Sequence, residues 1–580
     1  MLTRLVIRNF KRFAHAEVEL GRTVVCIGPN NSGKTTALQA LALWEAGLRR
    51  WLEKREKRTG QQAPERRPGV ALNRRDLVAV PVPDANLLWR DLHVRNVHTE
   101  DGRQQTSNVR IDITVEGVSA ERAWVCGLEF DYANEESLYC RPLRLDEAPG
   151  AARMPIPAEA GEVRIAFLPP MSGLIATETL LPDGAIDVRL GEGRTAEVLR
   201  NLCWKIWRSS PDGWDELRGR MHALFGVEIQ APRHVESRGE ISMAFRERGS
   251  RVSLDLAVAG RGLQQTLLLL AHLQTHPGSV LLLDEPDAHL EILRQREIYG
   301  VLTEAAERRD SQVIAASHSE VLLNEAARRD VVVAFVGRPH RIDDRGSQVL
   351  KSLREIGFED YYLAEQTGWV LYLEGSTDLA VLQAFARRLG HAAGAVLEQP
   401  FVRYVANQAQ KARDHFHGLS EAKPDLAGYA LFDHLPQLPG GDAHLTVTMW
   451  SRREIENYLC QPDTLLAWAA AEGGAQGPVI GAVWRREMES AMAEVENALR
   501  TLGRDPWSPE TKVSDDFLPP LFARFYARLG LPDLMRKTDF HTLAPFVPLE
   551  YLQGEVRDVL DGMLNVVSQA RPVGGEGGTG

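Results

Sequence analysis

Short apolar runs alternate with helical patterns along this 580-residue chain. Residues 2–10 and 16–20 alternate apolar and polar positions, which predicts a hairpin, and residues 23–27 form a continuous apolar strand. Further near-continuous apolar runs occupy residues 279–283, 313–316 and 331–336. Because buried parallel strands have this pattern and helices must connect them, we expect an α/β fold with a parallel sheet covered by helices.

The region between these two groups of strands has a different pattern. Residues 109–115, 123–130 and 163–167 alternate apolar and polar positions, which predicts an antiparallel β lobe. Helices are expected at residues 197–225 and 263–273, and one short strand is expected between them at residues 253–256. We therefore expect an insertion in the first domain over about residues 45–250, which begins with a charged segment at 51–76.

A second α/β series begins near Gly368, with expected strands at residues 370–373, 429–432 and 446–449. The expected domains are residues 1–367, a second α/β domain at 368–500, a helical C-terminal extension at 501–570 and a tail at 571–580. The tail is nearly all Gly and polar residues, so we expect it to be disordered.

Composition excludes some classes of protein. The chain is 44% hydrophobic and 25% charged, as in ordinary globular proteins, and no apolar run approaches the roughly 18 residues that span a bilayer. The five cysteines are scattered without metal-site spacing, which favours a reducing cytoplasm. They are Cys26, Cys126, Cys140, Cys203 and Cys460.

The net charge of −11 argues against a uniformly basic nucleic-acid binder, but local patches decide such binding. One basic patch follows the first expected helix, and it is either a solvated helix face and loop or a contact for the DNA backbone. Its members are Arg49, Arg50, Lys54, Arg55, Lys57, Arg58, Arg66, Arg67, Arg74 and Arg75.

A glycine-rich loop lies between the strand at 23–27 and a helical pattern that starts at Thr36. Its sequence is Gly28-Pro29-Asn30-Asn31-Ser32-Gly33-Lys34-Thr35. In this context GxxxxGK[ST] is a phosphate site, in which backbone N–H groups cradle phosphate, the lysine reaches the β- and γ-phosphates and the final hydroxyl holds Mg²⁺. The expected ATP-binding residues are Gly28, Asn30, Asn31, Ser32, Gly33, Lys34, Thr35 and Thr36.

The strand at 279–283 ends in two acids. Asp284 is placed to hold Mg²⁺ with Thr35, and Glu285 is placed to polarise an attacking water. Ser317 and His318 follow the next apolar strand, where we expect the histidine to sense the γ-phosphate. Together these residues predict an ATPase.

Residues 259–265, Ala-Gly-Arg-Gly-Leu-Gln-Gln, resemble the signature loop of ABC-type ATPases. In that family one subunit's loop completes the nucleotide site of another, which implies a homodimer or higher homo-oligomer with Gly260 and Gly262 at the nucleotide. Ala259 replaces the usual Ser, so fast hydrolysis is not expected. Together with Asn9-Phe10-Lys11, these motifs resemble the RecF/SMC branch over roughly residues 1–340.

A second set of acids follows the strands of the second domain. Glu374 and Asp378 follow the first strand, Asp433 the second, and Glu454 and Glu456 the third. Because the carboxyl ends of parallel strands share one edge, these acids could converge on Mg²⁺ or Mn²⁺. The alternative is a set of helix-start acids in an inert domain.

This order of acids resembles a Toprim domain, and a Toprim domain after an ABC-type ATPase resembles the OLD (overcoming lysogenization defect) family, which includes Gabija-type nucleases. The resemblance implies that Glu374, Asp378, Asp433 and one of Glu454 or Glu456 hold two metals for phosphodiester cleavage, and that Lys537 neutralises charge. Leu435 departs from the family, because it replaces the second acid of the usual Asp-x-Asp pair.

Three functions remain open at this point. The first is an ATP-regulated, metal-dependent DNA endonuclease in anti-phage defence. The second is a non-cleaving ATPase sensor or scaffold that acts with a partner defence protein, and Leu435 and Ala259 favour it. The third is a RecF-like repair ATPase that binds DNA without incision.

Overall fold

The computed structural model of the protein describes residues 1–56, 69–74, 77–100, 103–146, 152–171, 174–327, 329–342, 356–438, 440, 442–475 and 477–572. It divides into two compact units, Met1–Leu350 and Lys351–Gly580. Helix α10 (Phe358–Thr367) belongs to the second unit, where Asp360 contacts Arg403 at 2.9 Å and His415 at 3.0 Å. The division therefore falls before α10, whereas the sequence placed the boundary near Gly368.

The first unit contains a six-stranded sheet in the order β10-β16-β17-β3-β18-β19. Its strands are β3 (Thr23–Ile27), β10 (Ile165–Leu168), β16 (Val280–Asp284), β17 (Gln312–Ser317), β18 (Val331–Ala334) and β19 (His340–Arg341). Every neighbouring pair is parallel except β18 with β19. The predicted parallel sheet is confirmed, and its strands β3, β16 and β17 are fully buried because helices cover both faces.

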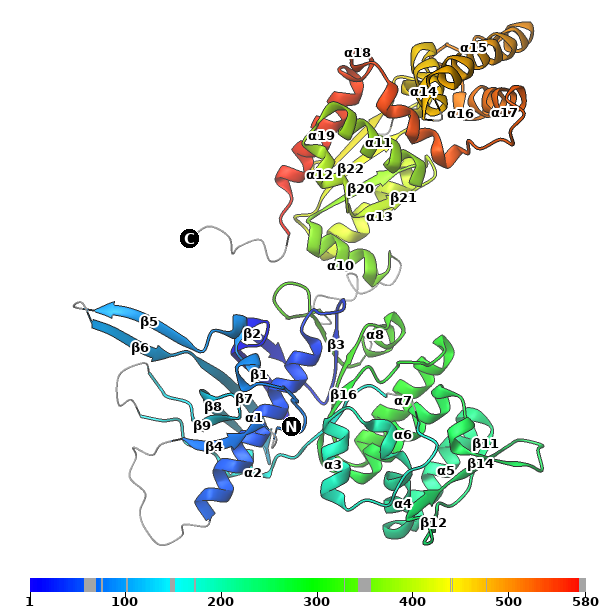
Figure 1. The fold of residues 1–580 in the computed structure, drawn as a ribbon. Coiled ribbons are helices and arrows are strands. Elements are labelled where there is room, and N and C mark those ends of the chain that lie inside the picture. The colour runs from blue at the N-terminus through cyan, green and yellow to red at the C-terminus, as the bar shows by residue number, and fades with distance from the viewer. Residues whose placement is uncertain are drawn as a thin grey trace. The chain divides into compact units, whose positions relative to one another are not determined.

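Four helices connect or cover these strands (Figure 1). They are α1 (Lys34–Glu56), α6 (Arg261–Thr275), α7 (Ile292–Arg308) and α8 (Glu320–Ala326). Helix α6 is buried along most of its length, since its run of leucines packs against Leu281 and Leu283 of β16 in one apolar core. This core holds the Asp284 end of β16 in place.

The prediction for residues 163–167 was wrong in one respect. We expected them in the antiparallel lobe, but β10 pairs in parallel with β16 at the edge of the nucleotide sheet. Its alternating pattern arises because Ala166 and Leu168 face one core while Ile165 and Phe167 pack against another. Alternation identifies a strand with two different faces, and it does not identify the sheet to which the strand belongs.

The antiparallel lobe is a second six-stranded sheet, in the order β2-β1-β7-β8-β9-β4. Its strands are β1 (Leu2–Phe10), β2 (Phe13–Glu19), β4 (Val70–Asn73), β7 (Arg110–Ser119), β8 (Arg122–Asn134) and β9 (Ser137–Pro142), and the hairpin β5 (Arg95–Glu100) and β6 (Arg103–Asn108) extends from it. Trp44 of α1 stacks on Trp124 of β8 and donates to the Cys126 carbonyl at 3.0 Å. Helix α1 thus joins the phosphate loop to this sheet.

A mostly helical region follows the lobe. It contains α2 (Ala158–Glu162), α3 (Asp183–Gly191), α4 (Leu199–Ser209), α5 (Pro211–Phe225), β11 (Val227–Ile229), β12 (Arg233–Val235), β13 (Glu240–Ser242), β14 (Ala244–Glu247) and β15 (Ser253–Asp255). The single helix that we predicted at 197–225 is two helices. The break falls at Ser210, which caps α5 by accepting from the Gly213 N–H, because Pro211 has no N–H to continue α4.

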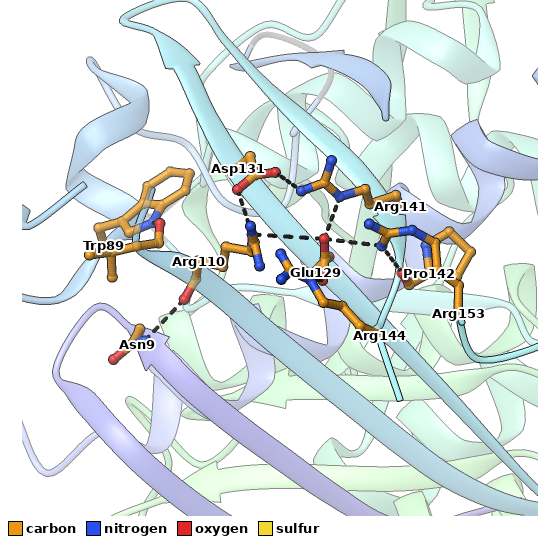
Figure 2. A network of polar contacts seen from close by, with 10 residues as sticks. Asn9, Trp89, Arg110, Glu129, Asp131, Arg141, Pro142, Arg144 and Arg153 are labelled. Atoms are coloured by element: carbon orange, nitrogen blue, oxygen red, sulfur yellow. Dashed lines mark hydrogen bonds and ion pairs between the residues drawn. The ribbon is translucent and has the colours of Figure 1, made fainter. Parts of the chain in front are cut away.

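The antiparallel sheet carries a network of arginines around two acids of β8 (Figure 2). Cross-strand register places Arg110 opposite Asp131 and Arg141 opposite Glu129. Glu129 is only 1% exposed and also contacts Arg153 at 3.0 Å and Arg144 at 3.3 Å. Since an isolated buried charge is costly, these guanidinium groups and carboxylates depend on one another.

The second unit contains a four-stranded parallel sheet in the order β21-β20-β22-β23. Its strands are β20 (Trp369–Leu373), β21 (Val402–Tyr404), β22 (Ala427–Phe432) and β23 (Leu445–Met449), and its helices include α11 (Ser376–Leu389), α12 (Ala393–Leu397), α13 (Ala409–Ala422) and α19 (Glu555–Gln569). The sequence predicted three of these strands. Strand β21 has only three residues and was missed.

The remaining helices of this unit are α14 (Pro462–Gly474), α15 (Pro478–Thr501), α16 (Val513–Asp516), α17 (Leu518–Arg528), the 3₁₀ segment η7 (Lys537–Phe546) and α18 (Leu549–Leu552). Leu371 of the sheet, Trp468 of α14 and Phe525 of α17 belong to one apolar core. The helices after residue 500 therefore pack as part of the second unit.

Some sequence predictions lie outside the described residues. These are the middle of the charged segment, 57–68 with 75–76, which includes Lys57, Arg58, Arg66, Arg67 and Arg75 of the basic patch, and residues 573–580 of the tail. In the described part of the patch, Arg49 pairs with Glu45 and Arg50 with Glu53. No helix among the described residues combines the length and apolar character that crossing a membrane requires.

We expect Glu129→Ala to destabilise the first unit by roughly 3–5 kcal/mol, because it leaves several partly buried guanidinium groups without their carboxylate. Urea unfolding of the full chain measures the loss. Glu116→Ala is the control, since Glu116 forms a partly exposed pair with Arg4 on the same sheet and should cost about 0–1 kcal/mol. Equal losses for the two variants would contradict the role of the network.

Candidate functional site

The phosphate loop closes tightly between β3 and α1. Asn31 has a φ of 61° and Gly33 a φ of 107°, so the chain turns through left-handed conformations before the helix begins. A Cβ at Gly33 would lie 2.4 Å from the Phe13 ring, so only glycine fits there. The Ser32 hydroxyl is buried and makes no hydrogen bond within the described structure, as expected of a group that faces a ligand.

Lys34 places its ammonium group inside this loop. The group is buried and donates to the carbonyl oxygens of Gly28 at 2.7 Å and Pro29 at 3.0 Å. Burial lowers the pKa of Lys34, while Asp284 and Glu285 act in the opposite sense. A phosphate chain in the loop would therefore meet a desolvated cation with limited freedom to move.

Thr35 and Asp284 join the loop to the end of β16. The Thr35 hydroxyl donates to the two Asp284 carboxylate oxygens, at 2.9 and 3.1 Å. Burial raises the pKa of Asp284 to about 6, and the Thr35 hydrogen bond partly offsets this. A hydroxyl beside a carboxylate at a phosphate loop suits Mg²⁺, which prefers oxygen ligands, so the residues present fit Mg·ATP.

Glu285 and His318 extend from neighbouring strand ends. The His318 Nδ1 lies 3.8 Å from the Glu285 Oε1, and their side chains are 57% and 36% exposed. Glu285 has a φ of 50°, and its N–H donates to the Ala316 carbonyl at 2.8 Å. The structure thus brings together the two groups predicted to polarise water and to sense the γ-phosphate.

The predicted signature loop lies at the start of α6. Gly260 is the N-cap of α6 and no side chain caps this helix, while Gly260 and Arg261 are exposed. A half-buried ion pair holds the preceding turn, because Arg200, which is 1% exposed, bonds the exposed Asp255 at 2.9 Å, and Asp255 accepts from the Ala257 N–H. The loop thus presents glycines and a helix N-terminus to solvent, with Ala259 supplying no hydroxyl.

In the second unit, Glu374 follows β20 and Asp378 lies in the first turn of α11. One Asp378 oxygen accepts from the N–H groups of Glu374 at 3.0 Å and Gly375 at 3.3 Å. Asp378 therefore caps this helix, and burial raises its pKa to about 6. Its second oxygen contacts the Thr377 hydroxyl at 3.3 Å.

Asp433 follows β22, the strand next to β20. Burial, a hydrogen bond with the Glu374 side chain and the nearby charges of Asp378 and Glu456 raise the pKa of Asp433 to about 9. Two carboxyl groups share a hydrogen bond only when one carries a proton. Glu374 and Asp433, which follow neighbouring strands, are thus in contact.

The structure separates Glu454 from Glu456. Glu454 is buried, and its carboxylate accepts from the Ser514 N–H at 2.5 Å and the Ser514 hydroxyl at 3.0 Å. Glu456 is also buried, and burial together with Glu454, Asp378 and Glu374 raises its pKa to about 8. Glu454 therefore anchors the 512–516 segment, whereas the Glu456 carboxylate lies within electrostatic reach of Glu454, Asp378 and Glu374.

Lys537 is half exposed and pairs with Asp515, which Lys512 also contacts at 2.7 Å. Asp515 raises the pKa of Lys512, with smaller contributions from Glu454 and Glu374. Lys512 is thus a cation within electrostatic reach of these acids, and the sequence analysis missed it. No motif marks it, because its position depends on the Ser514–Glu454 bonds.

Within the described part of the chain, no three carboxylate, imidazole or thiol groups stand in an arrangement that holds a metal ion. In the second unit, Glu374 and Asp433 share a hydrogen bond with each other. Leu435 lies two residues beyond Asp433 and contributes no ligand.

Two family models match the first unit. One is described as "AAA domain, putative AbiEii toxin, Type IV TA system" and matches residues 187–324, and the other is an AAA ATPase domain that matches residues 1–46. The matched segments contain Lys34 of the phosphate loop, Asp284 at the end of β16 and His318 after β17. These two segments of the chain are thus similar to AAA-type ATPase domains, which supports an ATPase function. No curated protein matches the chain.

Solved structures of SMC heads are similar in part. The Thermotoga maritima head covers 59% of this chain and 98% of its own, with 14% identity and a TM-score of 0.31. An Smc head bound to the C-winged helix domain of ScpA and a Pyrococcus furiosus head bound to the C-terminal domain of ScpA have 14% and 12% identity and TM-scores of 0.33 and 0.35. They cover 59% and 61% of this chain and 97% and 99% of their own. At these scores the likeness carries no argument about function.

We expect Lys34→Ala to weaken Mg·ATP binding by about 10- to 100-fold, because charge-assisted bonds to phosphate contribute roughly 1.5–3 kcal/mol. Isothermal titration with Mg·ATP measures the change. Lys54→Ala, which removes an exposed lysine of the same helix, should leave affinity unchanged. Equal affinity in all three proteins would contradict the assignment of the loop.

Proposed function

We propose that the protein is an ATP-regulated, metal-dependent DNA endonuclease of the OLD type, with a Toprim-like second unit, that acts in anti-phage defence. The observation that supports this most is the set of acids at one edge of the second sheet: Glu374, Asp378, Asp433 and Glu456. Like charges are costly when they are buried together, and proteins keep them where a cation is bound.

The chemistry follows from these positions. Bound Mg²⁺ or Mn²⁺ would activate a water and stabilise charge on the phosphate. Glu374 and Asp433, at neighbouring strand ends, would bind that cation, and Glu456 would supply the carboxylate that Leu435 does not. Asp378 would keep the Glu374 backbone in place through its two N–H bonds. Lys512 and Lys537, both on Asp515, would meet the DNA phosphate.

The ATPase unit would form a homodimer or higher homo-oligomer through its signature loop. Val258, next to the loop, is 67% exposed, and Ile292 and Leu293 at the start of α7 are 70% and 74% exposed. Burial of these three side chains between subunits would remove apolar surface from water. ATP held between subunits would then regulate cutting by the second unit.

Leu435 and Ala259 favour one alternative, a non-cleaving ATPase sensor that acts with a partner protein. In that case the second unit would bind its partner rather than cut DNA. The alternative and the nuclease differ in whether any metal-dependent incision exists, and a cleavage assay distinguishes them.

We expect wild type to cut plasmid or linear DNA in Mg²⁺ or Mn²⁺, and Glu374→Ala to lose about a hundredfold or more of this activity while it still binds ATP. Gel assays with and without ATP measure both cutting and the direction of ATP control. Cutting by Glu374→Ala at the wild-type rate would place the nuclease site elsewhere. No cutting by any form would favour the sensor.

The two neighbouring glutamates should behave differently. Glu456→Gln should abolish cutting with little change in unfolding temperature, because its carboxylate lies within electrostatic reach of the other acids. Glu454→Gln should keep cutting, since an amide oxygen can still accept from Ser514, and Glu454→Ala should lose roughly 1–3 kcal/mol of stability. Loss of cutting in Glu454→Gln alone would reverse the assignment of the two residues.

A further inference from the structure

The turn after β16 and the loop after β17 are joined by a buried hydrogen bond that no sequence motif indicated. The Ser317 hydroxyl donates to an Asp287 carboxylate oxygen at 2.7 Å. Asp287 is 3% exposed and Ser317 is fully buried. Burial raises the pKa of Asp287, while the Ser317 hydrogen bond and the nearby His318 act in the opposite sense.

The bond continues into a relay around His318. The Ser319 N–H donates to the Ser317 hydroxyl oxygen at 2.9 Å, so the residues on both sides of His318 are held. The Ser319 hydroxyl caps α8 and donates to the Gln295 Oε1 of α7 at 2.7 Å. Gln295 in turn donates to the Leu290 carbonyl at 3.0 Å, so the relay returns to the segment after β16.

The Glu285 and His318 side chains at the nucleotide site are not held by a hydrogen bond to each other. Glu285 and His318 are 3.8 Å apart, which is beyond a hydrogen bond. Glu285 is held through its backbone N–H to Ala316, the residue before Ser317. Their relative position therefore depends on the backbone of two loops, and Asp287–Ser317 is the buried contact that joins those loops.

We propose that Asp287 and Ser317 are positioning residues for ATP hydrolysis, which fix His318 against Glu285. The proposal rests on the ATPase activity proposed for this site. Within the described structure, no hydrogen bond or ion pair joins the side chain of either residue to Lys34 or Thr35, although the Asp287 charge acts on Lys34. Their loss should reduce turnover while the loop residues Lys34 and Thr35 continue to bind ATP.

The test compares the double variant Asp287→Leu/Ser317→Ala with Asp287→Asn, in which an amide oxygen can still accept from Ser317. Removing both polar groups avoids leaving a buried carboxylate unpaired. We expect kcat for ATP hydrolysis to fall about tenfold in the double variant with KM within about twofold, and Asp287→Asn to stay within about threefold of wild type.

Tyr299→Phe is the matched control. It removes a similar hydroxyl–carboxylate bond, Tyr299 to Asp330 at 2.6 Å, in the same unit and away from the predicted nucleotide residues. It should affect the unfolding temperature but not kcat. An equal fall in kcat for the control and the double variant would overturn the proposal, because general destabilisation would then explain both.

Hydrogen exchange provides a second measurement that does not need turnover. The Ser319 amide, which donates to Ser317, should exchange at least about tenfold faster in the double variant, and Asp287→Asn should retain protection. Unchanged exchange would overturn the proposal. If the wild type hydrolyses no ATP but the Ser319 amide still exchanges faster in the double variant, the contact is supported and the proposed ATPase activity is rejected. The two failures are therefore distinguishable.

Discussion

The parallel register of β3, β17 and β16 is the constraint on which the nucleotide site depends. Ile27 pairs with Ser317 and Ala316 with Asp284, so the phosphate loop, His318 and the acidic pair begin at the same level of one sheet edge. The Thr35–Asp284 bond then closes the group across β17, which lies between the two strands. A one-residue shift of any strand would turn its side chains to the other face and separate the group.

The same principle places the acids of the second unit, but their contacts differ. Leu373 at the end of β20 and Phe432 at the end of β22 precede Glu374 and Asp433, which meet because the strands are neighbours in parallel. Glu456 reaches them from a 3₁₀ turn, Ile455–Tyr458, that follows β23. Strand ends thus supply Glu374 and Asp433. Glu456 comes from a turn whose position depends on residues far away in the sequence.

These differences explain what the sequence could predict. The phosphate loop, Asp284, Glu285 and His318 end or follow apolar strands directly, so the local sequence pattern is enough to place them at strand ends. Glu454 and Glu456 lie two residues apart after the same strand, so local pattern cannot distinguish them. Ser514, 60 residues later in the chain, hydrogen-bonds the Glu454 carboxylate and so sets the two apart. Likewise, the two faces of β10 pack against two different cores, which gives it the alternating pattern of a lobe strand. Its local sequence therefore does not show that it pairs with β16.

The two units compensate their buried acids in different ways. In the first, hydroxyl groups donate to Asp284 and Asp287, and these hydrogen bonds partly offset the cost of burying each carboxylate. In the second, Glu374 and Asp433 have each other as partners, which raises the free energy of the ionised pair. The large apolar core that the C-terminal helices share with the second sheet can offset that cost. Local strain supported by a strong core is typical of a site kept for binding rather than for stability.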